Sequence, residues 1–228
     1  MRDLVIVGAG GFARETAAAV RAINEVRPTW RLRGFLDDDT ALHGTHRAGL
    51  PILGGIDLVA AMPAAAVVVC VGNPRDYVSR RRIVERIALP AQRYATIVHP
   101  SATVGAGSTV AAGSVLLAGV VLTAEVSVGA HVAVMPQAVL THDDRVSDYA
   151  TLASGVRLGG GAVLRPGAYV GAGALVREGV TIGDWSLVGM GSVVLRDVPP
   201  GEVWAGSPAR RLRAASLDES IVSKSVGS

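Results

Sequence analysis

Aliphatic residues recur at every sixth position through the second half of the chain. The unbroken series is Val98, Val104, Val110, Leu116, Leu122, Val128, Val134, Leu140, Val146, Leu152, Leu158, Leu164, Val170, Val176, Ile182, Val188 and Val194. A period of six is neither the 3.6 of a helix nor the 2 of a flat strand. It is typical of a parallel β-helix in which each hexad supplies a short strand and a turn. We therefore predict a triangular prism with three hexads in each coil.

The other hexad positions agree with this prediction. If the aliphatic residue is position 1, then position 5 is nearly always Ala, Ser or Val, so both positions point into the prism. Positions 2 to 4 form the turn, and all sixteen glycines from Gly105 to Gly191 fall there. We expect these glycines to supply positive φ angles. A β-helix that serves only as a spacer or binding rod is the alternative to a catalytic one.

The first 96 residues lack this period and predict a Rossmann-like α/β half domain. Strands are expected at residues 4–7, 31–36, 66–71 and 94–98, and helices at 14–26 and 75–88. The sequence thus divides into an α/β domain (1–96), a β-helix domain (97–198), and a C-terminal loop and tail (199–228).

A glycine-rich loop follows the first predicted strand. Its spacing reads G-x-G-x-x-A from Gly8, and a helix follows, so backbone N–H groups at the helix start suit a phosphate. The second strand ends at Asp37 and Asp38, where an acid commonly accepts hydrogen bonds from a ribose or base. A polar turn would also explain these acids. The domain has room for one nucleotide more readily than for a dinucleotide, so an NAD-dependent function is the weaker alternative.

Composition excludes several function classes. Only 4% of residues are aromatic and the net charge is +3, which argues against nucleic acid as a partner. The basic run Arg80, Arg81 and Arg82 lies in a predicted helix and is interpreted as a solvated face. Cys70 stands alone in an apolar run and is predicted to be core. Residues 4–7 are too short an apolar run for a signal peptide or membrane span, so a cytoplasmic location is expected.

One hexad, residues 140–145, breaks the pattern with a cluster of polar side chains. His142 and Asp143 occupy its turn, and Asp144 occupies position 5, where a buried carboxylate is costly unless it is hydrogen-bonded. Three hexads later, Gly160 should lie directly above His142. Local breaks in a regular pattern are where function is expected.

The polar hexad suits acyl transfer. An amine that attacks a thioester must lose a proton, and a neutral imidazole can take it near neutral pH. A carboxylate on the other ring nitrogen would hold the tautomer, and a backbone N–H would stabilise the oxyanion. His99 and His131 raise the alternative of a metal site shared between histidines, as in the γ-class carbonic anhydrases. Neither histidine lies a whole number of coils from His142, so the repeat does not place them on the same corner.

An α/β nucleotide domain joined to a hexapeptide prism resembles one acetyltransferase family. It comprises the enzymes that N-acetylate nucleotide-linked amino sugars, together with the sialic acid O-acetyltransferases. The resemblance is carried by the loop at residues 8–11, by residues 35–38, 71–73 and 97–100, and by residues 206–210 after the last coil. It implies a left-handed β-helix, acetyl-CoA as acyl donor with no metal, and a homotrimer whose active sites lie between subunits.

The resemblance also implies roles for single residues. His142 would be the general base, Asp143 its orienting acid, and Gly160 the amide that binds the acetyl oxygen. Acetyl-CoA would further contact Thr151, Ala172, Met190 and Arg210. The nucleotide-activated sugar would contact Gly8, Gly10, Gly11, Phe12, Asp37, Asp38, Gly72 and Asn73. Some relatives have histidine where this chain has Phe12 and Thr151, which leaves the substrate open.

We therefore expect an acetyl-CoA-dependent N-acetyltransferase acting on a nucleotide-linked amino sugar. O-acetylation of a sugar such as sialic acid needs the same base and is the alternative. A non-catalytic scaffold that binds nucleotide sugars is a third hypothesis. The sequence does not identify the nucleotide, the sugar or the position acetylated.

Overall fold

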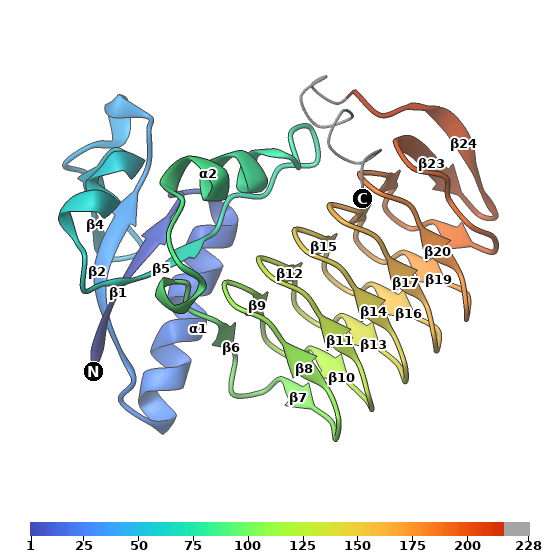
Figure 1. Cartoon of the computed structure of the whole chain (residues 1–228), viewed down its shortest axis with the longest axis horizontal. Helices are drawn as coiled ribbons and strands as arrows, with labels where there is room; N and C mark the ends of the chain where they lie inside the picture. The colour runs from blue at the N-terminus through green and yellow to red at the C-terminus, as the bar shows by residue number, and fades with distance from the viewer. Residues whose placement is uncertain (217–228) are drawn as a thin grey trace.

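An α/β unit and a triangular prism lie side by side in the computed structural model, which describes residues 1–216 (Figure 1). The predicted fold class, a Rossmann-like α/β domain followed by a left-handed parallel β-helix, is confirmed. Within the described residues no helix is long and apolar enough to cross a membrane.

The α/β unit is built on a five-stranded sheet with strand order β3-β4-β2-β1-β5. Its strands are β1 (Arg2–Val7), β2 (Trp30–Leu36), β3 (His46–Arg47), β4 (Leu50–Gly54) and β5 (Ala66–Val69). Pairing is parallel except between β3 and β4, which form a hairpin. The sequence pattern missed this hairpin because its strands are short and one of them is fully exposed.

Two α-helices flank the sheet, α1 (Gly11–Val26) and α2 (Ser79–Ile87). Three 3-10 helices lie at Thr40–Leu42, Ile56–Ala61 and Ala91–Arg93. Helix α2 begins later than the predicted residue 75. Asn73 starts a turn instead: its carbonyl accepts the Asp76 N–H at 2.9 Å and its side chain accepts the Arg75 N–H at 2.9 Å.

The prism consists of two-residue parallel strands on three faces. Face 1 holds β6 (Ile97–Val98), β9 (Val115–Leu116), β12 (Ala133–Val134), β15 (Thr151–Leu152), β18 (Tyr169–Val170) and β21 (Leu187–Val188). Face 2 holds β7 (Thr103–Val104), β10 (Val121–Leu122), β13 (Val139–Leu140), β16 (Arg157–Leu158), β19 (Leu175–Val176) and β22 (Val193–Val194). Face 3 holds β8 (Thr109–Val110), β11 (Ser127–Val128), β14 (Arg145–Val146), β17 (Val163–Leu164) and β20 (Thr181–Ile182). Each strand pairs with the one three hexads later, as Leu140 pairs with Leu158.

The turns correct one expectation about glycine. Positive φ is confined to hexad position 4, where Asp143 has φ 64° and Gly161 has φ 70°. Glycines at position 2 are needed for a different reason, which is the close approach of the next coil. A Cβ on Gly105 would lie 1.6 Å from the Thr123 carbonyl oxygen.

The α/β unit packs on face 1 of the prism. Phe12 and Ala17 of α1 share a core with Val115 and Ala133, which are outward-facing residues of face 1. A C-terminal hairpin of β23 (Glu202–Gly206) and β24 (Ala209–Ala214) extends face 1 beyond β21 (Figure 1). These strands occupy a segment expected to be a loop, and residues 217–228 of the expected tail lie outside the described residues.

Candidate active site

The polar hexad lies at the corner between faces 2 and 3, in the turn that joins β13 to β14. There His142 Nδ1 lies 2.7 Å from Asp143 Oδ2, and both side chains are exposed. Asp143 occupies the turn position with positive φ, a conformation that Asp adopts more readily than most residues. The carboxylate therefore binds Nδ1, and Nε2 is the ring nitrogen left for proton transfer.

Gly160 lies against the imidazole from the next coil. A Cβ at this residue would stand 2.4 Å from His142 Cε1 and 2.5 Å from Nε2. The two turns are joined by the Gly161 N–H, which donates to the His142 carbonyl at 2.8 Å. The structure therefore brings His142, Asp143 and Gly160 together, as the repeat spacing predicts.

Asp144 is fully buried beneath this corner. Its two oxygens accept the N–H groups of Thr141 and Ala162, each at 2.8 Å. Burial raises the pKa of this carboxyl to about 7, although the two backbone N–H groups and the nearby His142 act in the opposite direction. The sequence marks Asp144 as anomalous but predicts no role for it.

A second group of predicted residues lines a cavity of about 150 Å³ between the α/β unit and face 1. Phe12 and Gly72 come from the predicted nucleotide-sugar set, and Thr151 and Ala172 from the predicted acetyl-CoA set. Apolar side chains such as Met135 form most of the remaining wall. The structure thus joins residues that the sequence assigned to two different ligands.

Arg80 of α2 also lines this cavity and corrects the interpretation of the basic run. It is 2% exposed rather than solvated. Its Nη2 donates to the Thr151 hydroxyl at 2.8 Å and to the carbonyls of Tyr149 at 2.6 Å and Ala150 at 3.0 Å. Burial lowers the pKa of this guanidinium to about 10. The signal that distinguishes Arg80 from Arg81 is helical phase, because Arg80 lies four residues before the buried Val84.

The glycine loop leads into α1 with open space around its start. Gly8 has φ 99°, and a Cβ there would lie 2.9 Å from the Cys70 carbonyl oxygen. A Cβ on Gly10 or Gly11 would meet nothing within 4 Å, and Gly10 supplies no side-chain cap to the helix. The N–H groups of the first helical turn therefore remain available to an acceptor such as a phosphate.

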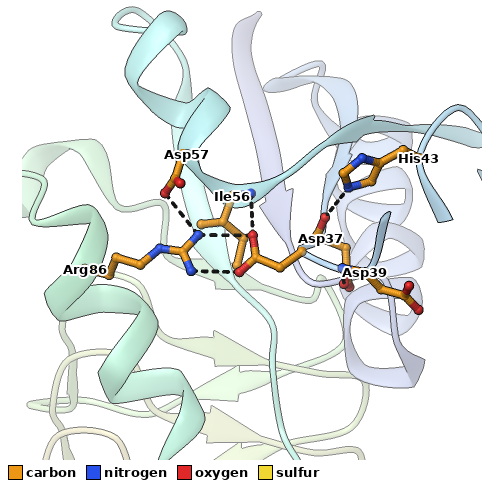
Figure 2. Close-up of polar contacts among 7 residues, drawn as sticks. Asp37, Asp39, His43, Ile56, Asp57 and Arg86 are labelled. Carbon is orange, nitrogen blue, oxygen red and sulfur yellow. Dashed lines mark hydrogen bonds and ion pairs between the residues drawn. The ribbon is translucent and has the colours of Figure 1, made fainter. Parts of the chain in front are cut away.

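The predicted acids after β2 already have partners within the chain. Asp37 Oδ2 accepts the Ala9 N–H at 2.9 Å and so holds the glycine loop. Asp38 accepts two hydrogen bonds from Arg86, at 2.7 and 3.1 Å, and a third from the Ile56 N–H. Figure 2 shows Arg86 extended between Asp57 and this acidic turn. Arg86 lowers the pKa of Asp38 through these hydrogen bonds.

The remaining predicted contacts lie away from the His142 corner. Met190 is 78% exposed at the corner between faces 1 and 2, one coil above Ala172. Arg210 lies on β24, and Asn73 lies in the turn before α2. The structure does not bring Met190 or Arg210 next to His142.

The other two prism histidines lie on separate corners. His99 follows β6 and His131 follows β11, whereas His142 follows β13. Among the described residues, no group of three or more His, Cys, Asp or Glu is placed to hold a metal ion. His131 is buried between the rings of Tyr94 and Tyr149, and burial lowers its pKa to about 4.

The two halves of the candidate site point away from each other within one chain. The α/β unit and the cavity lie on face 1, whereas His142 and Gly160 lie on the corner opposite that face. The His142 corner and the α/β unit of the same chain therefore lie on opposite sides of the prism.

Sequence comparison matches the first domain to a known family. The family model of the PglD N-terminal domain matches residues 3–87. The comparison with curated proteins found no match.

Solved structures resemble nearly the whole chain. The acetyltransferase domain of PglB from Neisseria gonorrhoeae is 30% identical with a TM-score of 0.81, covering 93% of this chain and 100% of that one. GDP-perosamine N-acetyltransferase from Caulobacter crescentus, in a variant solved with CoA and GDP-perosamine, is 27% identical with a TM-score of 0.80, covering 92% and 96%. WeeI from Acinetobacter baumannii is 27% identical with a TM-score of 0.79, covering 93% and 100%.

Proposed function

This chain belongs to the hexapeptide-repeat family of nucleotide-amino-sugar N-acetyltransferases, and we propose that it uses His142 to transfer an acetyl group from acetyl-CoA to a nucleotide-linked amino sugar. One observation carries the assignment of the base. His142 Nδ1 is held 2.7 Å from Asp143 Oδ2 while Gly160 lies against the other side of the ring. No other described histidine of the prism combines exposure with a carboxylate partner.

The chemistry follows from this geometry. The amine nitrogen of the sugar attacks the thioester carbonyl carbon, and His142 Nε2 takes the proton that the amine must lose. Asp143 on Nδ1 keeps the tautomer correct and stabilises the imidazolium. The Gly160 N–H stabilises the negative charge that develops on the thioester oxygen. The C–S bond then breaks, and the imidazolium returns its proton to the departing CoA thiolate.

The sugar nucleotide is placed by the α/β unit. The uncapped start of α1 provides N–H groups for its phosphates, and the loop is held by the Ala9–Asp37 hydrogen bond. The neighbouring cavity, with Phe12 and Thr151 in its wall, is where the sugar would reach the prism. The relative from Caulobacter was solved with CoA and GDP-perosamine, which supports both ligand classes.

A complete site requires a second chain. Because His142 lies opposite face 1, the sugar held by one chain must meet the His142 corner of its neighbour. In a closed symmetric ring the α/β unit of every chain meets the His142 corner of its neighbour, and we propose that the ring is a homotrimer. We also propose a cytoplasmic reaction, because acetyl-CoA is a cytoplasmic metabolite.

The test is a thiol-release assay with acetyl-CoA and a panel of amino sugars linked to UDP, GDP and dTDP. We expect stoichiometric release of CoA and an N-acetylated product with at least one member of the panel. Matched sugars with a hydroxyl in place of the amine separate N-acetylation from O-acetylation. Release of CoA only with the hydroxyl sugars would overturn the proposed acceptor.

The role of His142 is tested by His142→Ala. Loss of a general base should lower kcat roughly 10² to 10⁴-fold. The matched control is His99→Ala, which removes a turn histidine on another corner and should leave kcat unchanged. Unchanged turnover in His142→Ala would remove it from the mechanism.

A further inference from the structure

Hexad position 5 is an interior position of the prism, and Asp144 is its one charged occupant. Fifteen of the sixteen residues at this position between residues 102 and 192 are Ala, Ser or Val. Asp144 is 0% exposed, so its carboxylate has given up its solvent contacts entirely. Such burial is unfavourable unless the surrounding groups compensate it.

The compensating groups belong to the two turns that form the candidate active site. Asp144 Oδ2 accepts the N–H of Thr141, the residue directly before His142, at 2.8 Å. Asp144 Oδ1 accepts the N–H of Ala162, two residues after Gly160, also at 2.8 Å. One carboxylate therefore links the turn of the imidazole to the turn of the glycine against which it rests.

Serines at the same hexad position show what the fold alone requires. Ser108 accepts the N–H of Val126 at 3.1 Å, and Ser114 accepts the N–H of Val132 at 2.9 Å. Each bond is the counterpart of the one from Ala162 to Asp144. A serine thus satisfies the amide of the next coil, and the bond to Thr141 and the negative charge are what aspartate adds.

We propose that Asp144 is a positioning residue for the acetyl transfer, which fixes the His142 turn against Gly160 and places a buried negative charge behind the imidazole. The proposal rests on the proposed function of His142. A fixed turn keeps Nε2 and the Gly160 N–H at the spacing that the thioester needs. The negative charge stabilises the imidazolium that forms when His142 accepts the amine proton.

The charge of Asp144 depends on its surroundings. Its own turn carries His142 and Asp143, and Arg145 follows it on β14. The turn below carries Glu125, and the turn above the glycine carries Arg177 and Glu178. Burial raises the pKa of Asp144 to about 7, so the anion is present above neutral pH. Support for the imidazolium should accordingly grow as pH rises through neutrality.

The deciding variant is Asp144→Ser, because serine already occupies this position elsewhere and keeps the bond to the next coil. We expect kcat to fall roughly tenfold to 10²-fold, as for a catalytic group displaced by a fraction of an ångström. KM for both substrates should change less than about twofold, since Asp144 touches neither ligand. The matched control is Ser108→Ala, on the same corner two coils below, which should lower thermal stability and leave kcat unchanged.

A second readout does not depend on turnover. The ring signals of His142, assigned by their loss in His142→Ala, are compared by NMR at one pH. In Asp144→Ser they should shift and broaden, because the turn that carries the ring is no longer held against Gly160, whereas Ser108→Ala should leave them in place. A fall in melting temperature with kcat and the ring signals both unchanged would overturn the proposal. If the wild type itself turns over no acetyl-CoA, the proposed function fails, and the NMR comparison still shows whether Asp144 holds the His142 turn.

Discussion

At the scale of single residues, the absence of a side chain at Gly160 determines where the His142 ring can lie. A Cβ there would stand 2.4 Å from His142 Cε1. The backbone of Gly160 has no positive φ, and Ala occupies the same hexad position at residues 106, 112, 118 and 124. Gly160→Ala should therefore fold normally and displace the imidazole.

We expect Gly160→Ala to lower kcat by roughly 10²-fold, the cost of misplacing a reacting group by about 1 Å. Steady-state kinetics measure the fall in kcat, and a melting curve checks that the variant folds normally. Ala130→Gly changes the same hexad position on another corner and should retain full kcat. Full activity in Gly160→Ala would mean that the ring leaves the glycine during catalysis.

The residues of the candidate site differ in how far sequence could predict them. His142, Asp143 and Gly160 follow from an unbroken six-residue period, because the period alone determines which residues are stacked. The burial of Arg80 does not follow from composition, because the three arginines of the run are alike in sequence. Its burial depends on which side of α2 meets the prism, and that contact is tertiary.

At the scale of elements, buried polar groups join α2 and the turn before β6 to face 1. Arg80 crosses this boundary to the Tyr149 and Ala150 carbonyls. His131 packs edge-on to Tyr94, with ring centroids 4.5 Å apart, and stacks on Tyr149 at 5.4 Å. Burial and the nearby Arg80 charge lower the pKa of His131 to about 4 from a usual value of 6.5. The packing of the α/β unit on the prism should therefore be sensitive to acid.

The sign of this sensitivity follows from proton linkage. Between pH 6.5 and about 4 the unfolded chain protonates His131 and the folded chain does not, so stability falls as pH falls through this window. His131→Phe removes the titration and should lessen the loss at pH 5 by roughly 2 kcal/mol, or about 4–8 °C in Tm. Melting curves at pH 7.5 and pH 5 test it, with His46→Phe on the exposed strand β3 as control. Equal acid losses in His131→Phe and the wild type would contradict the prediction.

The elements themselves were predictable where a single periodicity governs them. Every prism strand follows from the hexad, whereas the α/β unit has no such repeat and its details depend on local turns. Asn73 delays the start of α2 by hydrogen bonding its own turn. The β3–β4 hairpin is joined through Ala48 and Gly49, both with positive φ, and its strands are too short to show alternation.

At the scale of the whole molecule, the hexad period places residues on corners but does not say which face the α/β unit covers. The structure answers this, because face 1 carries α1 and the cavity while the His142 corner lies opposite. A variant that lacks the His142 base and a variant whose face 1 cavity is blocked should therefore restore activity when they are mixed. This restoration is expected only if each site is formed by two subunits.

His142→Ala removes the base, and Gly72→Trp should fill the cavity of about 150 Å³ without straining the backbone, since Gly72 has no positive φ. Each variant alone is expected to be inactive. After the two are unfolded together and refolded at equal amounts, roughly a quarter of the sites in a heterologous ring pair an intact corner with an intact cavity. Activity should therefore recover to about a quarter of the wild type, measured by thiol release.

Light scattering should give the trimer mass for both variants and for the mixture. A mixture as inactive as its components, at trimer mass, would show that both halves of the site come from one chain and would overturn the shared-site proposal.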